Sequence, residues 1–283
     1  MVTLQQVAVS IIIGIVQGIS EWLPISSKTQ VLIASQTLLN LTFSQAYTFG
    51  LFMEVGTLIA AIIYFRRELW ALIQVIVGNR EPHKVMLLKY IVVTVIATGI
   101  IGAPIYLVAD SITGIALGIP MTILGIILIG DALLIRHSRI QQAMGKNTRM
   151  LKDLSWKEYL YIGIAQGIAA LPGVSRSGAT TSTLLLLHVE GDEAFRLSFF
   201  TGIFATAGAF ALTLVASKSN VTAALAGIGY AGLAIAIVAA TIVSLFLIDF
   251  LIKVAGKGRI VYLTAGLGII AIASGLIYLV LGL

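Results

Sequence analysis

Long apolar runs constrain the fold of this chain more than any other feature of its sequence. Six such runs are present, at residues 43–65, 90–109, 113–135, 195–217, 222–249 and 260–281. Each is long enough for an α-helix, which rises about 1.5 Å per residue, to cross a bilayer core about 30 Å thick. A single helix satisfies its own backbone hydrogen bonds in lipid, and these runs lack the short alternating pattern of barrel strands. The sequence therefore predicts an all-α polytopic membrane protein, built as a single membrane domain over residues 1–283.

Basic residues are concentrated between these runs. Most of the 18 Lys and Arg residues lie in three connections, at residues 66–89, 136–157 and 253–259. An excess of Lys and Arg marks the cytoplasmic side of a plasma membrane, so we predict all three connections on that side. We attribute the net charge of +6 to this topology. The charge distribution therefore predicts membrane lipids, and not nucleic acid, as the surroundings of the protein.

Two regions, residues 4–39 and 158–193, do not have the pattern of single spans. Each contains an apolar half, a break rich in Pro, Gly and Ser, and a second apolar half. Two spans lie between residue 194 and the basic connection at 253–259, so the region 158–193 must return to the side from which it starts. This favours a re-entrant helix hairpin, with two full spans as the alternative, and argues against one broken helix.

The two irregular regions also resemble each other. GIVQGISEWLPIS, from Gly14, and GIAQGIAALPGVS, from Gly163, share Gly, Ile, Gln, Gly, Ile, Leu, Pro and Ser with a slip of one residue. This predicts internal repeats over residues 1–135 and 158–283, joined by a basic cytoplasmic loop at 136–157. Each half would hold a re-entrant hairpin and about three transmembrane helices, and an odd number of crossings inverts the second half. The two breaks should then meet near the midplane, with both termini outside.

The second break, ALPGVSRSGATTS from Ala170, places Arg176 within a largely apolar chain. A guanidinium at membrane depth costs at least about 2.5 kcal/mol, so it needs a partner. Hydroxyl groups of Ser175, Ser177 and Thr180, with a backbone freed by Gly173, would surround it at the start of a half-helix, where the helix dipole favours an anion. Phosphate fits better than carboxylate, because arginine binds it bidentately and several donors reach its other oxygens.

A purely structural role for Arg176 is the alternative. The guanidinium would then pair with Glu21 or Glu54 and hold the two halves together.

The first break, QGISEWLPISSKTQ from Gln17, supplies complementary chemistry. Gln17 and Glu21 are four residues apart and share a helix face. Glu21 is a candidate general base, or a ligand for Mg²⁺ or Ca²⁺ held against phosphate oxygens. Ser26 and Ser27 offer a nucleophile or further donors. Lys28 either adds positive charge to the site or extends to the lipid headgroups.

These two motifs resemble the signatures of the undecaprenyl-diphosphatase family that is associated with bacitracin resistance, and the resemblance runs from residue 4 to the C-terminus. It implies a phosphatase that removes one phosphate from a polyprenyl diphosphate and so recycles the lipid carrier of cell-surface glycan synthesis. It further implies a divalent-cation requirement, a site reached from the outer face and a homodimer. Carried over by position, the functional residues are Gln17, Glu21, Ser26, Ser27, Ser175, Arg176, Ser177 and Thr180.

Two positions depart from the family pattern. The Ser-Ser pair is usually followed by Thr-Gly-His, and here it is followed by Lys28, Thr29 and Gln30. An amide can be neither nucleophile nor general acid, so we expect Gln30 to orient the diphosphate or the attacking group, while Glu21 activates water or Ser27. Glu54 stands where the family more often has Gln, which makes it a second candidate metal ligand.

A transporter is the alternative function. The same inverted repeat could alternate access to an anion site at the midplane and move a lipid phosphate or a small anion.

The predicted topology is testable by cysteine labelling, since the chain contains no cysteine. Lys84→Cys, Lys146→Cys and Lys257→Cys should react with a membrane-impermeant thiol reagent only from the cytoplasmic side, and a cysteine at Asp110 only from outside. External labelling at position 146 would contradict the inverted arrangement.

Overall fold

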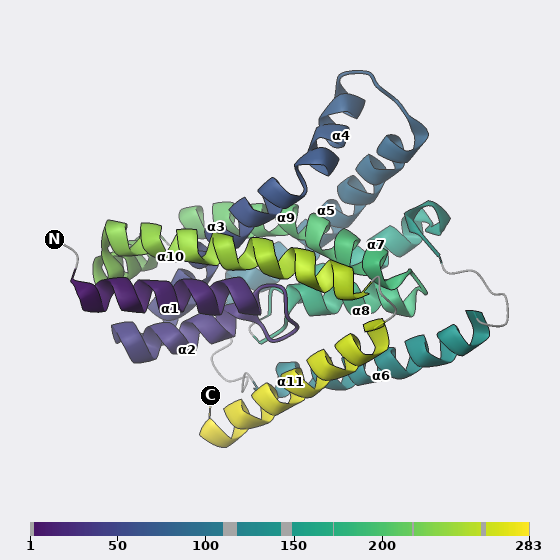
Figure 1. Ribbon diagram of the computed structural model, residues 1–283. Helices are drawn as coiled ribbons and strands as arrows, with labels where there is room; N and C mark the ends of the chain where they lie inside the picture. Colours follow the sequence, from purple (N-terminus) through teal and green to yellow (C-terminus); the bar gives the residue numbers. More distant parts are fainter. Residues whose placement is uncertain are drawn as a thin grey trace.

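The computed structural model describes residues 3–109, 118–142, 149–171, 173–216, 218–255 and 259–282 (Figure 1). Its helices are α1 (Leu4–Ser20), α2 (Ser27–Leu39), α3 (Phe43–Tyr64), α4 (Arg66–Ile76), α5 (Pro82–Ala109), α6 (Gly118–Gln142), α7 (Trp156–Ile168), α8 (Arg176–Leu186), α9 (Gly191–Ala216), α10 (Lys218–Val254) and α11 (Ile260–Leu281), with a 3-10 turn at Leu151–Asp153. The all-α prediction is confirmed. Three positions named above for labelling, Asp110, Lys146 and Lys257, lie outside the described residues.

Most of the predicted spans are present as long apolar helices. Within the described ranges, four helices have the length and composition to cross a membrane: Pro82–Val108, Gly191–Val215, Ile228–Val254 and Val261–Leu281. The pair α3 and α4 could form a fifth span, although it is bent by 72°. The run predicted at 113–135 corresponds to α6, whose described apolar part, Met121–Leu133, is shorter. The protein is thus a multi-pass membrane protein.

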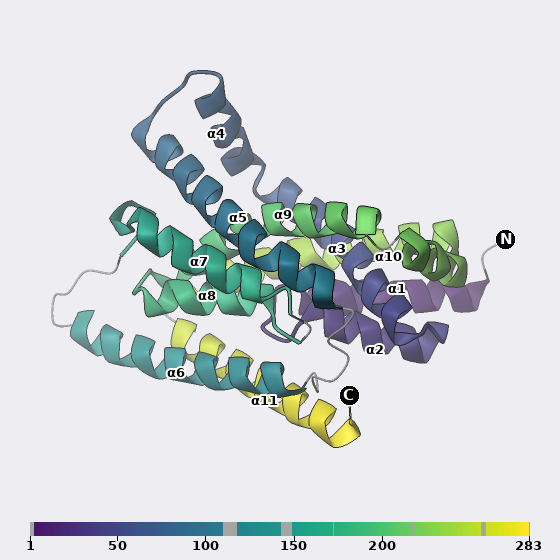
Figure 2. The ribbon, with the colours of Figure 1, turned by 180° about the vertical axis from the view of Figure 1, so that it is seen from behind.

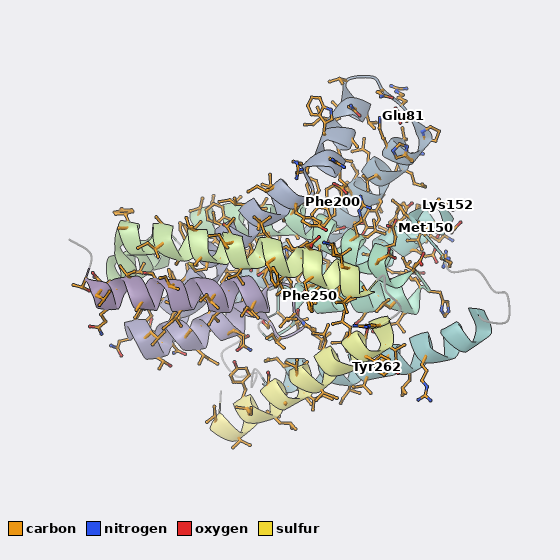
Figure 3. The ribbon with its side chains drawn as sticks, viewed as in Figure 1. Glu81, Met150, Lys152, Phe200, Phe250 and Tyr262 are labelled. Carbon is orange, nitrogen blue, oxygen red and sulfur yellow. The ribbon has the colours of Figure 1, made fainter. Side chains whose placement is uncertain are left out.

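The outer surface of the bundle is apolar. Figure 3 shows Phe250 and Tyr262 on the outside of α10 and α11, and these side chains are 48% and 81% exposed. Large exposed apolar side chains are expected where lipid rather than water surrounds a helix. Phe200, in contrast, is buried within the bundle.

The basic connection at 66–89 contains a helix that the apolar runs did not predict. Phe65 is fully buried and leaves helical geometry, with φ −92° and ψ 21°, and α4 begins immediately after it. Charged residues at the start of α4 end the apolar run, and they concealed the continuing helical periodicity of Leu69 and Leu72, which pack on the core. In Figures 1 and 2, α4 and the beginning of α5 project away from the other helices.

Each irregular region forms two helices separated by a break. α1 packs against α2 around the break at residues 21–26, and α7 packs against α8 around the break at 169–175. Figures 1 and 2 show the members of each pair side by side. The predicted sequence of helix, break and helix is therefore confirmed in both regions.

Repeated glycines let each of these helix pairs approach a long helix from the other half of the chain. Gly14 and Gly18 of α1 face α10, and Gly163 and Gly167 of α7 face α5. At Gly163, an added Cβ would lie 2.5 Å from Thr94 O and would overlap that atom. Small residues at such contacts are typical of membrane helices, whose association relies on close packing. The two halves are consequently interlocked.

Aromatic side chains fix the first break against α9. Trp22 follows Glu21 and is 3% exposed. Its ring meets that of Phe199 edge-on, with centroids 4.9 Å apart, and Phe199 also meets Phe195 at 5.7 Å. Edge-to-face pairs add stabilisation beyond the area they bury. The break is therefore supported by packing and not only by its hydrogen bonds.

Helix α6 continues to Gln142, into the connection predicted at residues 136–157. Arg149, near the end of that connection, is held by two hydrogen bonds: Nη1 and Nη2 donate to Glu158 Oε1 and Oε2 at 2.7 and 3.0 Å. Nη1 also donates to Leu187 O at the end of α8. The hydrogen bonds from Arg149 hold the pKa of Glu158 at about 2.

Gly163→Leu should strongly destabilise the protein, because a side chain there must separate α7 from α5. We expect a loss of at least about 3 kcal/mol, seen as a lower melting temperature in detergent. Gly266→Leu is the matched control, since an added Cβ at that position in α11 meets nothing within 4 Å. Equal melting temperatures for the two variants would contradict the close α5–α7 contact.

Candidate active site

Glu21 is a buried carboxylate at the first break. It directly follows α1, is 5% exposed, and its backbone N–H donates to Gln17 O. Its Oε2 accepts hydrogen bonds from Gln17 Nε2 at 2.8 Å and from Ser27 Oγ at 2.6 Å. Its Oε1 accepts from Arg176 Nη2. Both oxygens therefore have donors, as a buried charge requires.

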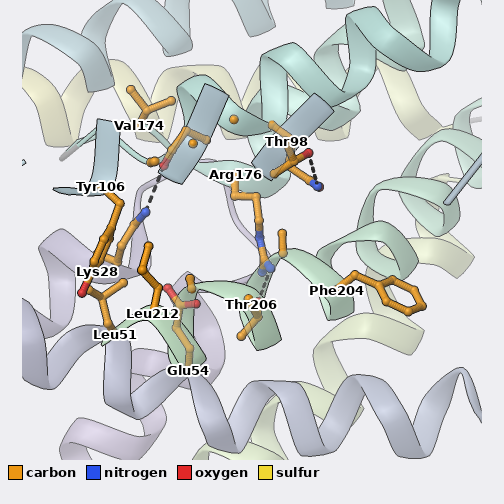
Figure 4. Close-up of a pocket in the computed structure, with 18 of the residues that line it drawn as sticks. Lys28, Leu51, Glu54, Thr98, Tyr106, Val174, Arg176, Phe204, Thr206 and Leu212 are labelled. Carbon is orange, nitrogen blue, oxygen red and sulfur yellow. Dashed lines mark hydrogen bonds between the residues drawn. The ribbon is translucent and has the colours of Figure 1, made fainter. Parts of the chain in front are cut away.

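Arg176 is the first residue of α8, and its guanidinium extends to α9. Nη1 donates to Gly202 O at 2.5 Å and to Thr206 Oγ1, while Nη2 pairs with Glu21. An added Cβ at Gly202 would lie 3.1 Å from Nη1, so glycine leaves room for the guanidinium. Glu21 and Glu54 were the two predicted ion-pair partners of Arg176, and among the described ion pairs Arg176 pairs with Glu21. Figure 4 shows the guanidinium directed towards Thr206.

The two breaks end in the same way. Ser26 and Ser175 are the N-cap residues, and Ser27 and Arg176 are the first residues, of α2 and α8. Both first residues reach the side chain of Glu21. The positive ends of two half-helices therefore converge on one point, which favours a bound anion.

Ser175 and Ser177 connect the second break to the first. Ser175 Oγ donates to Leu23 O at 3.1 Å, and Ser177 Oγ donates to Glu21 O at 3.1 Å. The two hydroxyl oxygens are 3.2 Å apart. These contacts hold the backbone that carries Glu21 against the start of α8. Hydroxyls that were predicted to bind a ligand thus also hold the two breaks together.

Three other predicted residues lie beside the site without facing it. Thr180 is fully buried and donates to a backbone oxygen of its own helix at 2.9 Å. Gln30 Nε2 donates to Ile25 O at 3.0 Å, and Gln30 Oε1 accepts from Tyr278 OH at 2.9 Å. Gly173 has φ +85°, a left-handed conformation that glycine adopts without strain. The structure gives these residues positions that support the two breaks.

A cavity of about 320 Å³ opens beside the ion pair (Figure 4). Its polar end is formed by Glu21, Ser26, Ser27, Lys28, Glu54, Ser175 and Arg176. Most of the remaining wall consists of apolar or small residues from α3, α5, α7 and α9. Five predicted site residues do not line it: Gln17, Gln30, Gly173, Ser177 and Thr180. The cavity thus combines a charged end with a largely apolar wall.

Lys28 and Glu54 complete the charges of this cavity. Lys28 Nζ donates to Ala169 O at 2.9 Å, across to the second break. Glu54 is 6% exposed, and its carboxylate makes no hydrogen bond to residues in the described ranges. With Arg176 and Glu21, the cavity therefore holds two cationic and two anionic side chains.

Sequence reasoning missed several residues of the site. Thr206 and Gly202, on α9, hold the guanidinium but belong to no recognisable motif. Gln166 lines the cavity and donates to Thr98 Oγ1 at 3.0 Å, and its Oε1 has no partner in the part of the chain that the structure describes. The internal repeat could have identified Gln166, since it occupies the position of Gln17 in the second copy.

Comparison with known proteins supports the resemblance seen in the motifs. The family described as bacitracin resistance protein BacA matches residues 10–273. Undecaprenyl-diphosphatase from Saccharolobus solfataricus is 49% identical over 274 residues, 96% of each chain. The Sulfurisphaera tokodaii enzyme of the same name is 48% identical over 93% of this chain and 94% of its own. The Pyrobaculum islandicum enzyme of this name is 38% identical over 94% of this chain and 96% of its own. The chain therefore belongs to the BacA, or undecaprenyl-diphosphatase, family.

Proposed function

We propose that this protein hydrolyses a polyprenyl diphosphate to the monophosphate and inorganic phosphate, and so recycles a lipid carrier of cell-surface glycan synthesis. The observation that carries the proposal is the buried cluster of Glu21, Ser27 and Arg176 at the polar end of an apolar-walled cavity. A substrate with a diphosphate head and a hydrocarbon tail matches both ends of that cavity. The relatives' shared name, undecaprenyl-diphosphatase, supports the same substrate class.

Glu21 would take a proton from the attacking oxygen. Ser27 Oγ already donates to Glu21 Oε2 at 2.6 Å, and a water in that position would donate in the same way. The attacking oxygen bonds to the terminal phosphorus while the bond from phosphorus to the bridging oxygen breaks, and the polyprenyl monophosphate leaves. If Ser27 attacks, water then cleaves the phosphoserine and releases inorganic phosphate.

Arg176 would bind the transferred phosphoryl group. Its Nη1 is held by α9, so the guanidinium is fixed in place before substrate arrives. A phosphate oxygen that replaces Glu21 Oε1 at Nη2 would release that carboxylate to act as the base. The planar cation would also stabilise the charge on the phosphoryl oxygens in the transition state.

A divalent cation fits the side chains of the cavity. The two cationic and two anionic side chains balance, so a bound diphosphate brings uncompensated negative charge. Within the described residues no three His, Asp or Glu side chains form a metal cluster, but Mg²⁺ commonly uses one or two carboxylates together with substrate phosphates. Among the described residues the Glu54 carboxylate has no hydrogen-bond partner, so it would be the main ligand, with Glu21 as the second candidate. Mg²⁺ or Ca²⁺ would supply charge neutralisation when bound.

The packing supports the inverted-repeat arrangement as part of the proposal. When the halves are matched through their repeated motifs, the contact of α1 with α10 corresponds to that of α7 with α5, and the contact of α2 with α3 to that of α8 with α9. Termini on the outer side follow from the basic connections, and a site open to that side is what the family resemblance implies. The homodimer and the plasma membrane location remain predictions.

Arg176→Lys should lose most activity although it keeps the charge. A point ammonium cannot reproduce a planar, bidentate contact with phosphate, and the expected cost is about 2 to 4 kcal/mol, roughly 30- to 1,000-fold in turnover. Arg196→Lys is the control, because Arg196 forms an exposed ion pair with Glu68. Phosphate release from a polyprenyl diphosphate is measured for both; near-normal turnover by folded Arg176→Lys would remove the phosphate-binding role.

Glu21→Gln and Glu54→Gln should fail in different ways. The first removes the base, so turnover should be lost at every metal concentration. The second should retain turnover but require a higher concentration of Mg²⁺ or Ca²⁺, since a metal ligand is weakened. Titration of each variant with metal after chelator treatment separates the roles. An unchanged metal requirement in Glu54→Gln would rule out the proposed ligand.

A further inference from the structure

Side-chain hydrogen bonds connect α5 and α9 at two levels along their length. At one level, Thr201 Oγ1 donates to Tyr90 OH at 2.8 Å, and Tyr90 OH in turn donates to Leu197 O. At the other, Tyr106 OH donates to Thr213 Oγ1 at 2.9 Å. The residues of α5 and α9 that line the cavity lie between these two hydrogen-bonded contacts, at positions 95–106 of α5 and 204–212 of α9.

Two glycines lie between these two levels. Gly99 of α5 and Gly208 of α9 both line the cavity and both are exposed. An added Cβ at either position would meet no atom of the described residues within 4 Å. Most glycines of this bundle that face another helix are in tight contact with it, as Gly163 is. Gly99 and Gly208 therefore leave the cavity wall between α5 and α9 without side chains.

The corresponding interface in the other half is closed. Matching the halves through their repeated motifs makes α3 and α10 the counterparts of α9 and α5. There, a Cβ added to Gly56 would lie 2.8 Å from Ala240 Cβ, and Thr241 Oγ1 donates to Gly56 O at 2.9 Å. The opening is thus confined to one of two equivalent interfaces and is not a general feature of the packing.

The cavity behind the opening calls for a ligand with a polar head. Gln166 is 3% exposed, lines the cavity, and its Oε1 lacks a partner within the described ranges. Arg176 and Lys28 supply positive charge at the same end, while Phe204 and Leu212 line the side towards α9 (Figure 4). A volume of about 320 Å³ is at the lower limit for a drug-sized ligand, so a long hydrocarbon chain must continue outside it.

We propose that the opening at Gly99 and Gly208 is a lateral port, through which the isoprenyl chain of the substrate passes from the site into the bilayer. This inference rests on the proposed phosphatase function. The absence of side chains at the two glycines sets the width available to a methyl-branched chain. The port would let the diphosphate reach Arg176 while the remaining hydrocarbon stays in lipid, where it costs no desolvation.

Gly99→Leu and Gly208→Leu test the port by filling it. Each variant is assayed for phosphate release from a long polyprenyl diphosphate and from a three-unit isoprenyl diphosphate, whose short tail need not cross the port. The ratio of kcat/KM for the long substrate to that for the short one should fall at least roughly tenfold, the scale expected when a pocket excludes extra hydrocarbon. Gly130→Leu and Gly266→Leu, on α6 and α11, are the matched controls, because an added Cβ there also meets open space.

The outcomes separate the two proposals. If the wild type is active but the port variants keep its ratio of kcat/KM values, or lose activity on both substrates equally, the port proposal is wrong and the phosphatase proposal stands. A wild type inactive on both diphosphates would overturn the phosphatase and the port with it. Melting temperatures of the port variants close to wild type, together with the selective loss, would support the port.

Discussion

A guanidinium cannot be left unpaired inside a membrane, and much of the arrangement around Arg176 follows from that constraint. Glu21 neutralises it, α9 supplies a carbonyl and a hydroxyl to its other nitrogen, and glycine at position 202 leaves room for it. The hydroxyls of Ser175 and Ser177 then fix the two breaks against each other. A substrate phosphate would enter a network that is already satisfied, so it must exchange with an existing acceptor.

The two motif-bearing regions resemble each other in sequence but differ in chemistry. Gln17 and Gln166 occupy the same position, but Gln17 is followed four residues later by Glu21, whereas Gln166 is followed by Ala170. Likewise the first residue of one half-helix is Ser27 and that of the other is Arg176. The two helix N-termini meet at Glu21: the first region contributes a hydroxyl and its acceptor, and the second contributes the cation.

The helices and the members of the charged cluster could be predicted from sequence, because both follow from the cost of polar groups in lipid. Arg176, Glu21 and Ser27 do meet. The direction of Thr180 could not be predicted, since it depends on the rotation of α8 within the bundle. No sequence pattern identified Thr206, because its contact with the guanidinium depends on how α9 packs against α8. α4 was missed because charge at its start outweighed its helical periodicity.

The interlocking of α1 with α10 and of α7 with α5 has a consequence for the order in which the protein can assemble. Synthesis delivers α1 before the part of α10 against which its glycines pack, which follows the kink at Gly229 and lies more than half the chain later. Glu21 is likewise synthesised before the arginine that pairs with it. Until the second half has been made, the first half lacks both a packing surface for α1 and the ion-pair partner of Glu21. The site can therefore form only late in assembly, after the second half of the chain has been made and has packed against the first.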